Sequence, residues 1–444
     1  MDEKQTELSP QGKLAKMFAI WLSPLGVRFI SPEAEQAYRN RVTRIENVIQ
    51  LRVPDRVPIY VNGGFFSAHC AGMTPEEAMY DYDKLNKAWR NHILDLQPDA
   101  FGGTGTPGPG RAYEILDYKL YLLPGHGIPG DAPYQCAEAE YMRADEYDAL
   151  IQDPSDFWLR TYLPRIFGAL EPLKRLRSLE HANEMPFTST YLAAYGSPEV
   201  RSAFEALLAA GEEAVKWSEA IAACNRVVIE SGFPLLSGGW SKAPFDVLAD
   251  TLRGTRGIAL DMYRQPDKLL EALDRLTPLM TKVGVTSTQP SGRPLVFIPL
   301  HKGADGFMSD EQYRIFYWAS LKKVILGLVN EGLIPYVFAE GAYNTRLEIV
   351  RDIPRGRTIW HFDYTDMARA KEALGDIACI AGNVPISLLS IGHPDEVKDY
   401  CKKLIDVAGR NGGFILASGA AIDTARRENV QAMIEFTREY GVYS

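Results

Sequence analysis

The chain has 444 residues, 46% of them hydrophobic, which is enough to bury a large core in one decorated barrel or in two to three ordinary domains. Its formal net charge of −9 argues against a nucleic-acid partner, because phosphate binding normally requires a basic surface. Five cysteines are scattered without the CxxC spacing of zinc fingers, and this pattern favours a reducing, cytoplasmic environment over a disulfide framework.

Residues 1–50 predict an N-terminal helical extension that packs on the main body of the protein or on another subunit. The segment contains bulky apolar side chains such as Phe18, Trp21 and Leu25. Prolines and charges interrupt these side chains, so the segment matches neither a signal peptide nor a membrane span.

From residue 51 onward, apolar runs that end in glycine or polar residues alternate with helical patterns. Thr74 and Ser309 occupy the positions of helix N-caps after two of these runs. Residues 113–223 interrupt the alternation as an insertion, predicted as a hairpin over 113–142 followed by helices. The predicted strands are Arg56–Gly64, Pro98–Gly103, Phe233–Gly239, Pro294–His301, Leu333–Glu340, Thr358–Asp363, Ile377–Asn383 and Gly413–Gly419.

This alternation predicts an α/β fold, and we expect a (β/α)8 TIM barrel over residues 51–444. A doubly wound open sheet has the same periodicity and is the alternative. The barrel is favoured because polar residues fall at the ends of most predicted strands, and in a barrel those ends meet at one mouth. These residues are Asn62, Ser237, His301, Glu340, His361, Asp363, Asn383 and Ser418.

Three of these strand ends suggest a metal site. His361 and Asp363 are two residues apart, so a strand places them on one face of the sheet. His301, Glu340 and His361 end three consecutive predicted strands, and two imidazoles with a carboxylate and an open position form an accepted catalytic zinc site. In the alternative interpretation, His301 bonds a loop, Glu340 pairs with a nearby cation, and Asp363 caps the next helix.

Five motifs, occurring in this order, resemble the uroporphyrinogen decarboxylase superfamily, and within it the corrinoid-dependent methyltransferase branch. The likeness runs from about Arg52 to the C-terminus and is strongest after Glu230. It implies a (β/α)8 barrel independently of the strand pattern. The motifs are Pro299–Phe307, Phe338–Gly341, His361–Asp363, Ala381–Pro385 and Ser418–Asp423.

Two departures from the superfamily pattern narrow the expected chemistry. Decarboxylases of porphyrinogens carry an arginine-rich run after the first strand, but Val61–Cys70 contains no arginine to pair with several substrate carboxylates. Methyltransferases of the branch bind zinc through a His-x-Cys pair and a cysteine in the last strand's turn. Asp363 and Ala420 stand at those two places, which puts thiol activation in doubt and leaves harder ligands for zinc.

The resemblance therefore implies a methyltransferase subunit that moves a methyl group from a small methylated donor to cob(I)alamin on a separate corrinoid protein. An aryl methyl ether or a methylamine-like compound would serve as the donor. The corrinoid is expected on a partner because the chain lacks an Asp-x-His-x-x-Gly run. Homodimerisation is plausible for this superfamily. We assign catalytic roles to Asp363 and Asn383, and substrate binding to Asn62, His126 and Ser237.

Two other functions stay open on the sequence alone. The first is a decarboxylase or other lyase that acts on a smaller acid, without a corrinoid protein or a metal. The second is a non-catalytic binding subunit, which the missing thiolates would favour. Polar residues at so many predicted strand ends argue against this second possibility.

Overall fold

The computed structural model describes residues 8–103, 105 and 107–443. A six-stranded sheet has the order β11-β10-β9-β8-β7-β6, and a separate pair joins β1 to β2; every neighbouring pair in these two sheets is parallel. The strands are β1 (Tyr60–Val61), β2 (Ala100–Phe101), β6 (Gly239–Trp240), β7 (Leu295–Leu300), β8 (Ile334–Ala339), β9 (Ile359–Phe362), β10 (Cys379–Val384) and β11 (Phe414–Ser418).

Single parallel bridges connect the two sheets at both edges. Ile59, just before β1, pairs with Leu416 in β11, and Phe101 in β2 pairs with Leu235, just before β6. Each of the predicted strands therefore contains residues paired with a neighbour, and the α/β prediction is confirmed. The third strand lies later than expected, because its regular pairing is at Gly239–Trp240.

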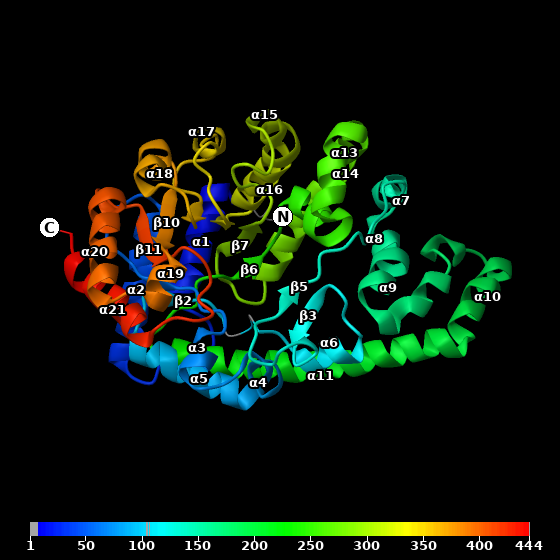
Figure 1. Ribbon diagram of the computed structural model, residues 1–444, viewed down its shortest axis with the longest axis horizontal. Helices are drawn as coiled ribbons and strands as arrows, with labels where there is room; N and C mark the ends of the chain where they lie inside the picture. Colours follow the sequence, from blue (N-terminus) through cyan, green and yellow to red (C-terminus); the bar gives the residue numbers. More distant parts are fainter. Residues whose placement is uncertain (1–7, 104, 106, 444) are drawn as a thin grey trace, which may run out of the picture.

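Helices follow the strands along the chain and surround them in an arc (Figure 1). Thr74 and Ser309 form capping boxes with Glu77 and Gln312, which confirms both predicted N-caps. The helices are α3 (Phe66–Cys70), α4 (Pro75–Tyr80), α5 (Tyr82–Leu96), α12 (Pro244–Asp246), α13 (Gly254–Arg264), α14 (Pro266–Thr288), α15 (Asp310–Gln312), α16 (Ala319–Asn330), α17 (Leu347–Val350), α18 (Met367–Leu374), α19 (Ile386–Ile391), α20 (Pro394–Leu404) and α21 (Arg427–Tyr440).

The segment between β2 and β6 contains a hairpin and several helices. Strands β3 and β5 are antiparallel, and α11 runs along the base of the molecule in Figure 1. No helix in the described part of the chain, α11 included, has the length and apolar character needed to cross a membrane. The elements are α6 (Gly110–Ile115), β3 (Tyr121–Pro124), β4 (Gly127–Ile128), β5 (Gln135–Cys136), α7 (Tyr147–Gln152), α8 (Pro154–Phe157), α9 (Leu163–Ile166), α10 (Met185–Ala193) and α11 (Pro198–Glu230).

Alternate residues of the strands face two different cores. Val296, Val337 and Trp360 belong to the cluster formed with the surrounding helices. Leu295 and Ile359 belong to a second cluster, formed with α1 (Pro10–Leu22) and α2 (Pro32–Ile49).

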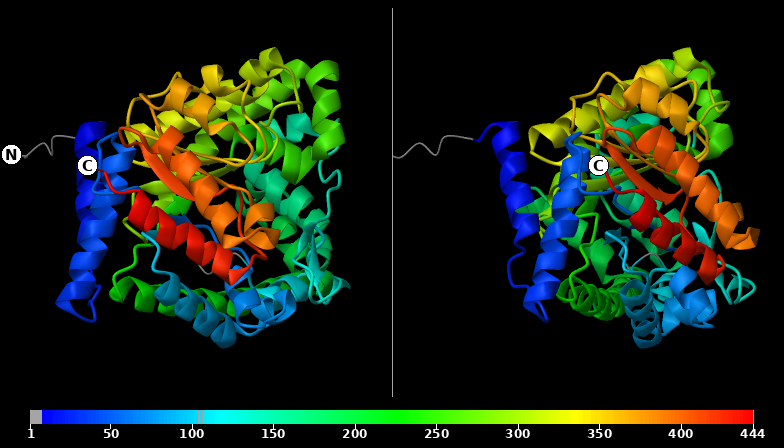
Figure 2. Two further views of the ribbon diagram at one scale, coloured as in Figure 1. Left: turned by 60° about the vertical axis from the view of Figure 1, so that its left-hand side comes forward. Right: turned by 90° about the vertical axis from the view of Figure 1, so that its left-hand side faces the viewer.

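Helices α1 and α2 stand side by side at one edge of the molecule (Figure 2). Their buried side chains, including Phe18, Trp21 and Val42, pack against first residues of strands such as Leu295 and Ile359. The N-terminal helices thus cover the amino ends of the strands. The carboxyl ends of the strands are not covered by α1 and α2, and polar side chains lie there. Active sites of parallel α/β barrels form at these ends.

Candidate active site

Three polar side chains come directly after consecutive strands at the carboxyl edge of the sheet. His301 follows β7, Glu340 follows β8 and Asp363 follows β9. The structure brings His301 and Glu340 together, with 3.6 Å between Nε2 of the histidine and Oε1 of the glutamate. These two residues form the centre of the candidate active site.

A carboxylate that the sequence analysis did not single out holds the other side of the His301 ring. Asp250 Oδ2 lies 2.6 Å from His301 Nδ1, and the same oxygen lies 2.9 Å from Lys242 Nζ. A carboxylate accepts hydrogen bonds, so Nδ1 is the donor and Nε2 faces Glu340. The His301 ring is therefore oriented by one acid and directed toward another.

Asp246 fixes the backbone on which His301 is carried. Its side chain is fully buried and accepts hydrogen bonds from the backbone N–H of His301 at 3.0 Å and of Lys302 at 3.2 Å. The hydroxyl of Tyr317 donates a third bond at 2.7 Å. Burial, followed by the charge of Asp250, raises the pKa of Asp246 to about 6.

Asp246 and Asp250 are brought to the mouth by the segment after β6. Helix α12 begins at Pro244 and continues as a π-helical turn over Val247–Arg253, which places the two carboxylates one turn apart. The Asp-x-x-x-Asp spacing directly after a strand was the signal that could have identified this pair.

The charged side chains of the site shift the pKa values of His301 and Glu340. Burial alone lowers the pKa of His301, but the hydrogen bond and charge of Asp250, with Glu340 and Asp246, raise it above its ordinary value. Burial raises the pKa of Glu340, and the charge of His301 opposes that rise. The imidazole therefore keeps its proton to a higher pH than an ordinary histidine does, and it lies beside a carboxylate, as suits a general acid.

Asp363 lies at the same mouth in a different environment. Its Oδ2 accepts a hydrogen bond from the backbone N–H of Gly341 at 3.1 Å, and burial raises its pKa. Gly419 leaves the space beside it, since a Cβ there would lie 3.0 Å from Asp363 Oδ1. The catalytic role predicted for Asp363 fits this position and stays a prediction.

His361 does not face the open mouth. Its side chain is fully buried among the rings of Tyr60, Tyr336 and Phe338. Its Nε2 lies 2.7 Å from the carbonyl of Ser418 and its Nδ1 lies 2.6 Å from the hydroxyl of Tyr336. The carbonyl can only accept, so Nε2 carries the proton and Nδ1 accepts from the tyrosine.

The predicted zinc site therefore does not fit the structure. Both nitrogens of His361 already have partners, and Nδ1 of His301 is bonded to Asp250. Throughout the described residues, no group of three or more His, Cys, Asp or Glu side chains is arranged to hold a metal ion. Strand position suggested that the three side chains converge, whereas the His361 ring points into the packed interior.

Asn383 also has a structural environment. Its Nδ2 donates to the backbone carbonyls of Asp363 at 2.9 Å and Thr365 at 2.8 Å. The side chain is 5% exposed and lines a cavity of about 390 Å³ that Asp363 shares. Asn383 thus positions the chain after β9, and its predicted catalytic role is not tested by these contacts.

The predicted substrate-binding residues lie in three separate places. Asn62 directly follows β1, and its carbonyl accepts from Ile422 N at 2.9 Å, so it lies at the carboxyl edge as expected. Ser237 was placed wrongly: its carbonyl accepts from Nε of Arg293, which precedes β7, and it therefore lies at the amino end. The glycine pair after Ser237 suggested a strand end, but the strand continues through Gly239 and Trp240.

His126 lies in the insertion, on the turn between β3 and β4. Its Nε2 is 2.7 Å from Glu114 Oε1 on α6, and its ring packs on Tyr80. Gly125 and Gly127 on either side have positive φ, which explains why glycine flanks the histidine. The contacts tie the turn to α6, and closure over a substrate stays a prediction.

The insertion also reaches the candidate active site. Glu138, just after β5, accepts a hydrogen bond from the backbone N–H of Thr255. The hydroxyl of Thr255 in turn accepts from Lys302 Nζ at 2.8 Å. The hairpin of the insertion is thereby anchored to the residue that follows His301.

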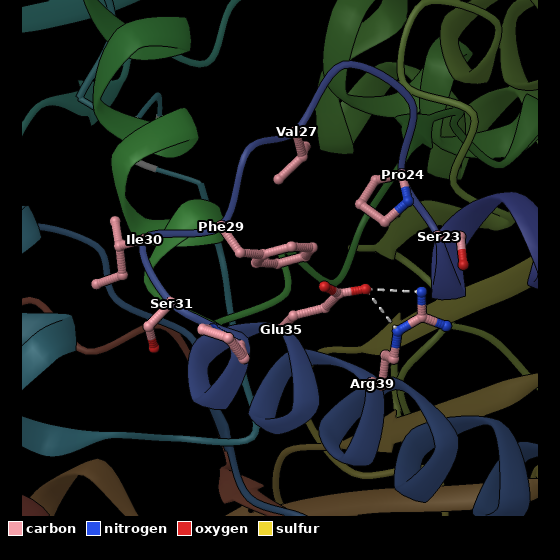
Figure 3. Close-up of a pocket in the computed structure, with 9 residues that line it drawn as sticks. Ser23, Pro24, Val27, Phe29, Ile30, Ser31, Glu35 and Arg39 are labelled. Atoms are coloured by element: carbon pink, nitrogen blue, oxygen red, sulfur yellow. Dashed lines mark hydrogen bonds and ion pairs between the residues drawn. The ribbon is translucent and has the colours of Figure 1, made fainter.

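A larger hollow lies away from this site. It has a volume of about 490 Å³ and is formed by the connection between α1 and α2 (Figure 3). Glu35 and Arg39 form an ion pair at 2.8 Å along its wall. Because α1 and α2 cover the amino ends of the strands, this hollow is separated by the sheet from His301 and Glu340.

Comparisons with known proteins agree with the resemblance noted in the sequence. The model of the uroporphyrinogen decarboxylase (URO-D) family matches residues 198–440, more than half of the chain. Among solved structures, a methyltransferase from Methanosarcina mazei has a similar fold, with a TM-score of 0.56 and 16% sequence identity. The match covers 90% of this chain and 98% of that one. A search of curated protein sequences finds no match.

Proposed function

Because this chain belongs to the uroporphyrinogen decarboxylase family, we propose that it is a methyltransferase whose strands close into a (β/α)8 barrel. The bridges that join β1 and β2 to both edges of the six-stranded sheet support closure. The similar fold of a protein described as a methyltransferase supports the activity. The substrates would be a small methylated donor and cob(I)alamin carried by a separate corrinoid protein.

The observation that carries the proposal is the pairing of His301 with Asp250 and Glu340. Transfer of a methyl group to cobalt breaks a C–O or C–N bond, and the electron pair of that bond stays on the departing oxygen or nitrogen. His301 Nε2 would donate a proton to an oxygen that leaves, or keep a nitrogen protonated while it leaves. Asp250 on Nδ1 stabilises the imidazolium until the proton is transferred.

The carboxylates at the mouth argue against a substrate with many acidic groups. Glu340, Asp363 and Asp250 all lie there, and Val61–Cys70 contains no arginine. Arg346 follows Glu340 in the sequence, but its side chain is fully buried and donates hydrogen bonds to Asp310 and to the carbonyl of Met308. The substrate that fits this charge pattern is neutral or cationic, and a porphyrinogen is neither.

A single-turnover assay tests the proposed function. The protein is mixed with excess cob(I)alamin and one methylated amine or methyl ether at a time, and oxidation of the cobalt is followed by absorbance. Transfer that exceeds the protein-free reaction, with the demethylated product identified by mass spectrometry, is the expected result. Absence of transfer from every donor, with release of carbon dioxide from a small acid in the absence of cobalamin, would instead identify a decarboxylase.

A further inference from the structure

A small pocket in the insertion is lined mainly by tyrosine rings. Its volume is about 200 Å³, which suits a ligand of few atoms. It lies between the hairpin and the α4–α6 region. The lining residues are Met79, Pro107, Tyr113, Tyr118, Tyr121, Leu123 and Tyr134.

The four tyrosines form a continuous series of ring contacts. Centroids are 5.2 Å apart between Tyr113 and Tyr118, 5.8 Å between Tyr118 and Tyr121, and 5.5 Å between Tyr121 and Tyr134. Every ring is half-buried, and burial raises the pKa of each hydroxyl, to about 12 for Tyr134. The rings therefore stay neutral, and a neutral phenol ring has an electron-rich face that attracts cations.

The pocket adjoins the mouth of the sheet. Tyr134 packs edge-to-face on Phe65, with centroids 5.7 Å apart. The backbone N–H of Phe65 donates to Asp423 Oδ1 at 3.0 Å, and Asp423 follows β11. The series of rings thus leads from the insertion to the carboxyl ends of β1 and β11.

Three carboxylates act electrostatically on rings of the pocket. Burial is the main cause that raises the pKa of Tyr121 and Tyr134; the charges of Asp250 and Glu340 add to the rise at Tyr121, and the charge of Asp423 adds to that at Tyr134. Two cations close to these carboxylates already have partners, because Lys242 pairs with Asp250 and Lys302 donates to a threonine hydroxyl. An anionic ligand would be repelled here, and a neutral arene would gain stacking but no charge attraction.

We propose that this tyrosine pocket binds the methylated ammonium group of a small cationic compound. Aromatic faces backed by carboxylates are the surroundings that stabilise a quaternary ammonium group, which cannot donate hydrogen bonds. The identification of the bound compound as the methyl donor rests on the proposed function. The affinity of the pocket for a methylated cation is independent of that function.

The chemistry of such a donor balances without any further reactant. The C–N bond breaks, its electron pair stays on nitrogen, and a neutral amine leaves; the methyl carbon bonds to cobalt through the electron pair of cob(I)alamin. For a tertiary amine donor, the nitrogen must be protonated for the same cleavage. The proton on His301 Nε2 would supply that charge.

The test compares choline with its neutral carbon analogue, 3,3-dimethyl-1-butanol, by isothermal titration calorimetry on the full chain. The two molecules share shape and hydroxyl group and differ in the charge of the central atom. Choline should bind about tenfold more tightly, because a partly desolvated cation–π interaction is worth about 1 to 2 kcal/mol. Equal affinities, or tighter binding of the alcohol or of anisole, would overturn the proposal.

Matched variants locate the binding. Tyr121→Leu removes a ring and should weaken choline binding about tenfold, whereas Tyr121→Phe keeps the ring and should bind choline like wild type. Tyr263→Leu, at an exposed tyrosine on α13, is the control. If Tyr121→Leu fails to fold, Asp423→Asn should weaken choline binding and leave the alcohol unaffected. Unchanged choline binding in Tyr121→Leu, or in Asp423→Asn, contradicts the proposal.

The same experiments separate this inference from the proposed function. Selective choline binding without methyl transfer from any donor keeps the cation pocket and refutes the methyltransferase. Methyl transfer from an aryl ether, with no preference for cations in binding, keeps the methyltransferase and refutes the cation pocket.

Discussion

His301 and His361 lie two strands apart in the same sheet but in opposite surroundings. His301 is about one-third exposed, and a carboxylate bonds its Nδ1. His361 is enclosed by aromatic rings and is bonded to a hydroxyl and a carbonyl. The pKa of His301 lies above its ordinary value, whereas burial lowers that of His361 to about 4, despite the hydrogen bond to Ser418.

The difference shows that the charge of the partner, more than the position on a strand, decides what a histidine can do. A carboxylate stabilises an imidazolium and offsets the cost of partial burial. Neutral oxygens inside an apolar shell do not offset it, so that ring stays neutral. His301 is thus suited to holding a proton for a reaction, and His361 to holding strands together.

The largest expected effect is on methyl transfer in the His301→Gln variant. Glutamine can still bond Asp250 but cannot hold the proton, so the rate should fall by about 10²- to 10⁴-fold. The free energy of unfolding should change by less than about 1 kcal/mol, because Asp250 keeps its pairing with Lys242. Single-turnover kinetics and urea unfolding measure the two quantities. A variant that transfers methyl groups at the wild-type rate would remove His301 from the mechanism.

The His361→Ala variant should show the reverse pattern. It leaves a cavity among three rings and removes the partner of the buried Tyr336 hydroxyl, so the free energy of unfolding should fall by about 3 kcal/mol. Methyl transfer should stay close to wild type at temperatures where the variant is folded. The exposed His69 on α3 provides a control, since His69→Ala should leave both quantities unchanged. Full stability of His361→Ala, or a loss of transfer without a loss of folding, would contradict this assignment.

The pH dependence of unfolding provides a further test of His361. Its pKa in the folded protein is about 4, below the ordinary value of 6.5, so between these values the unfolded chain binds a proton that the folded protein does not. The contribution of His361 to the free energy of unfolding is therefore complete above pH 6.5 and is lost as the pH falls to 4. The contribution amounts to about 3 kcal/mol over this range. Burial also lowers the pKa of His92 to about 4, so it acts in the same direction. The measurement is therefore the difference between wild type and His361→Ala in urea unfolding at pH 4 and pH 7; a pH-independent difference would contradict it.

The smallest expected effect is a shift of the pH–rate profile in Asp250→Asn. Loss of the carboxylate charge and hydrogen bond lowers the pKa of His301, so the alkaline limb of the profile should move to lower pH. Asp274→Asn, at an exposed carboxylate of α14 paired with Lys323, should leave the profile in place. An unchanged alkaline limb in Asp250→Asn would show that another group titrates.

Much of the fold could be predicted because it depends on local patterns. Apolar runs, glycine turns and the N-caps at Thr74 and Ser309 act over a few residues, and the structure confirms them. The third strand was shifted because the glycines after Ser237 were interpreted as its end, although the pairing with β7 extends the strand. Pairing between strands depends on a neighbour that lies far away in the sequence.

The sequence by itself determined that His361 and Asp363 lie at the end of one strand and that His301 and Glu340 lie at the ends of two others, since both follow from local strand patterns. Only the tertiary structure decided their partners. Asp250 is 51 residues from His301, and Ser418 is 57 residues from His361. Contacts over such separations are fixed by how the whole chain packs, and these contacts, more than the residue types, suit one histidine to holding a proton and make the other a part of the core.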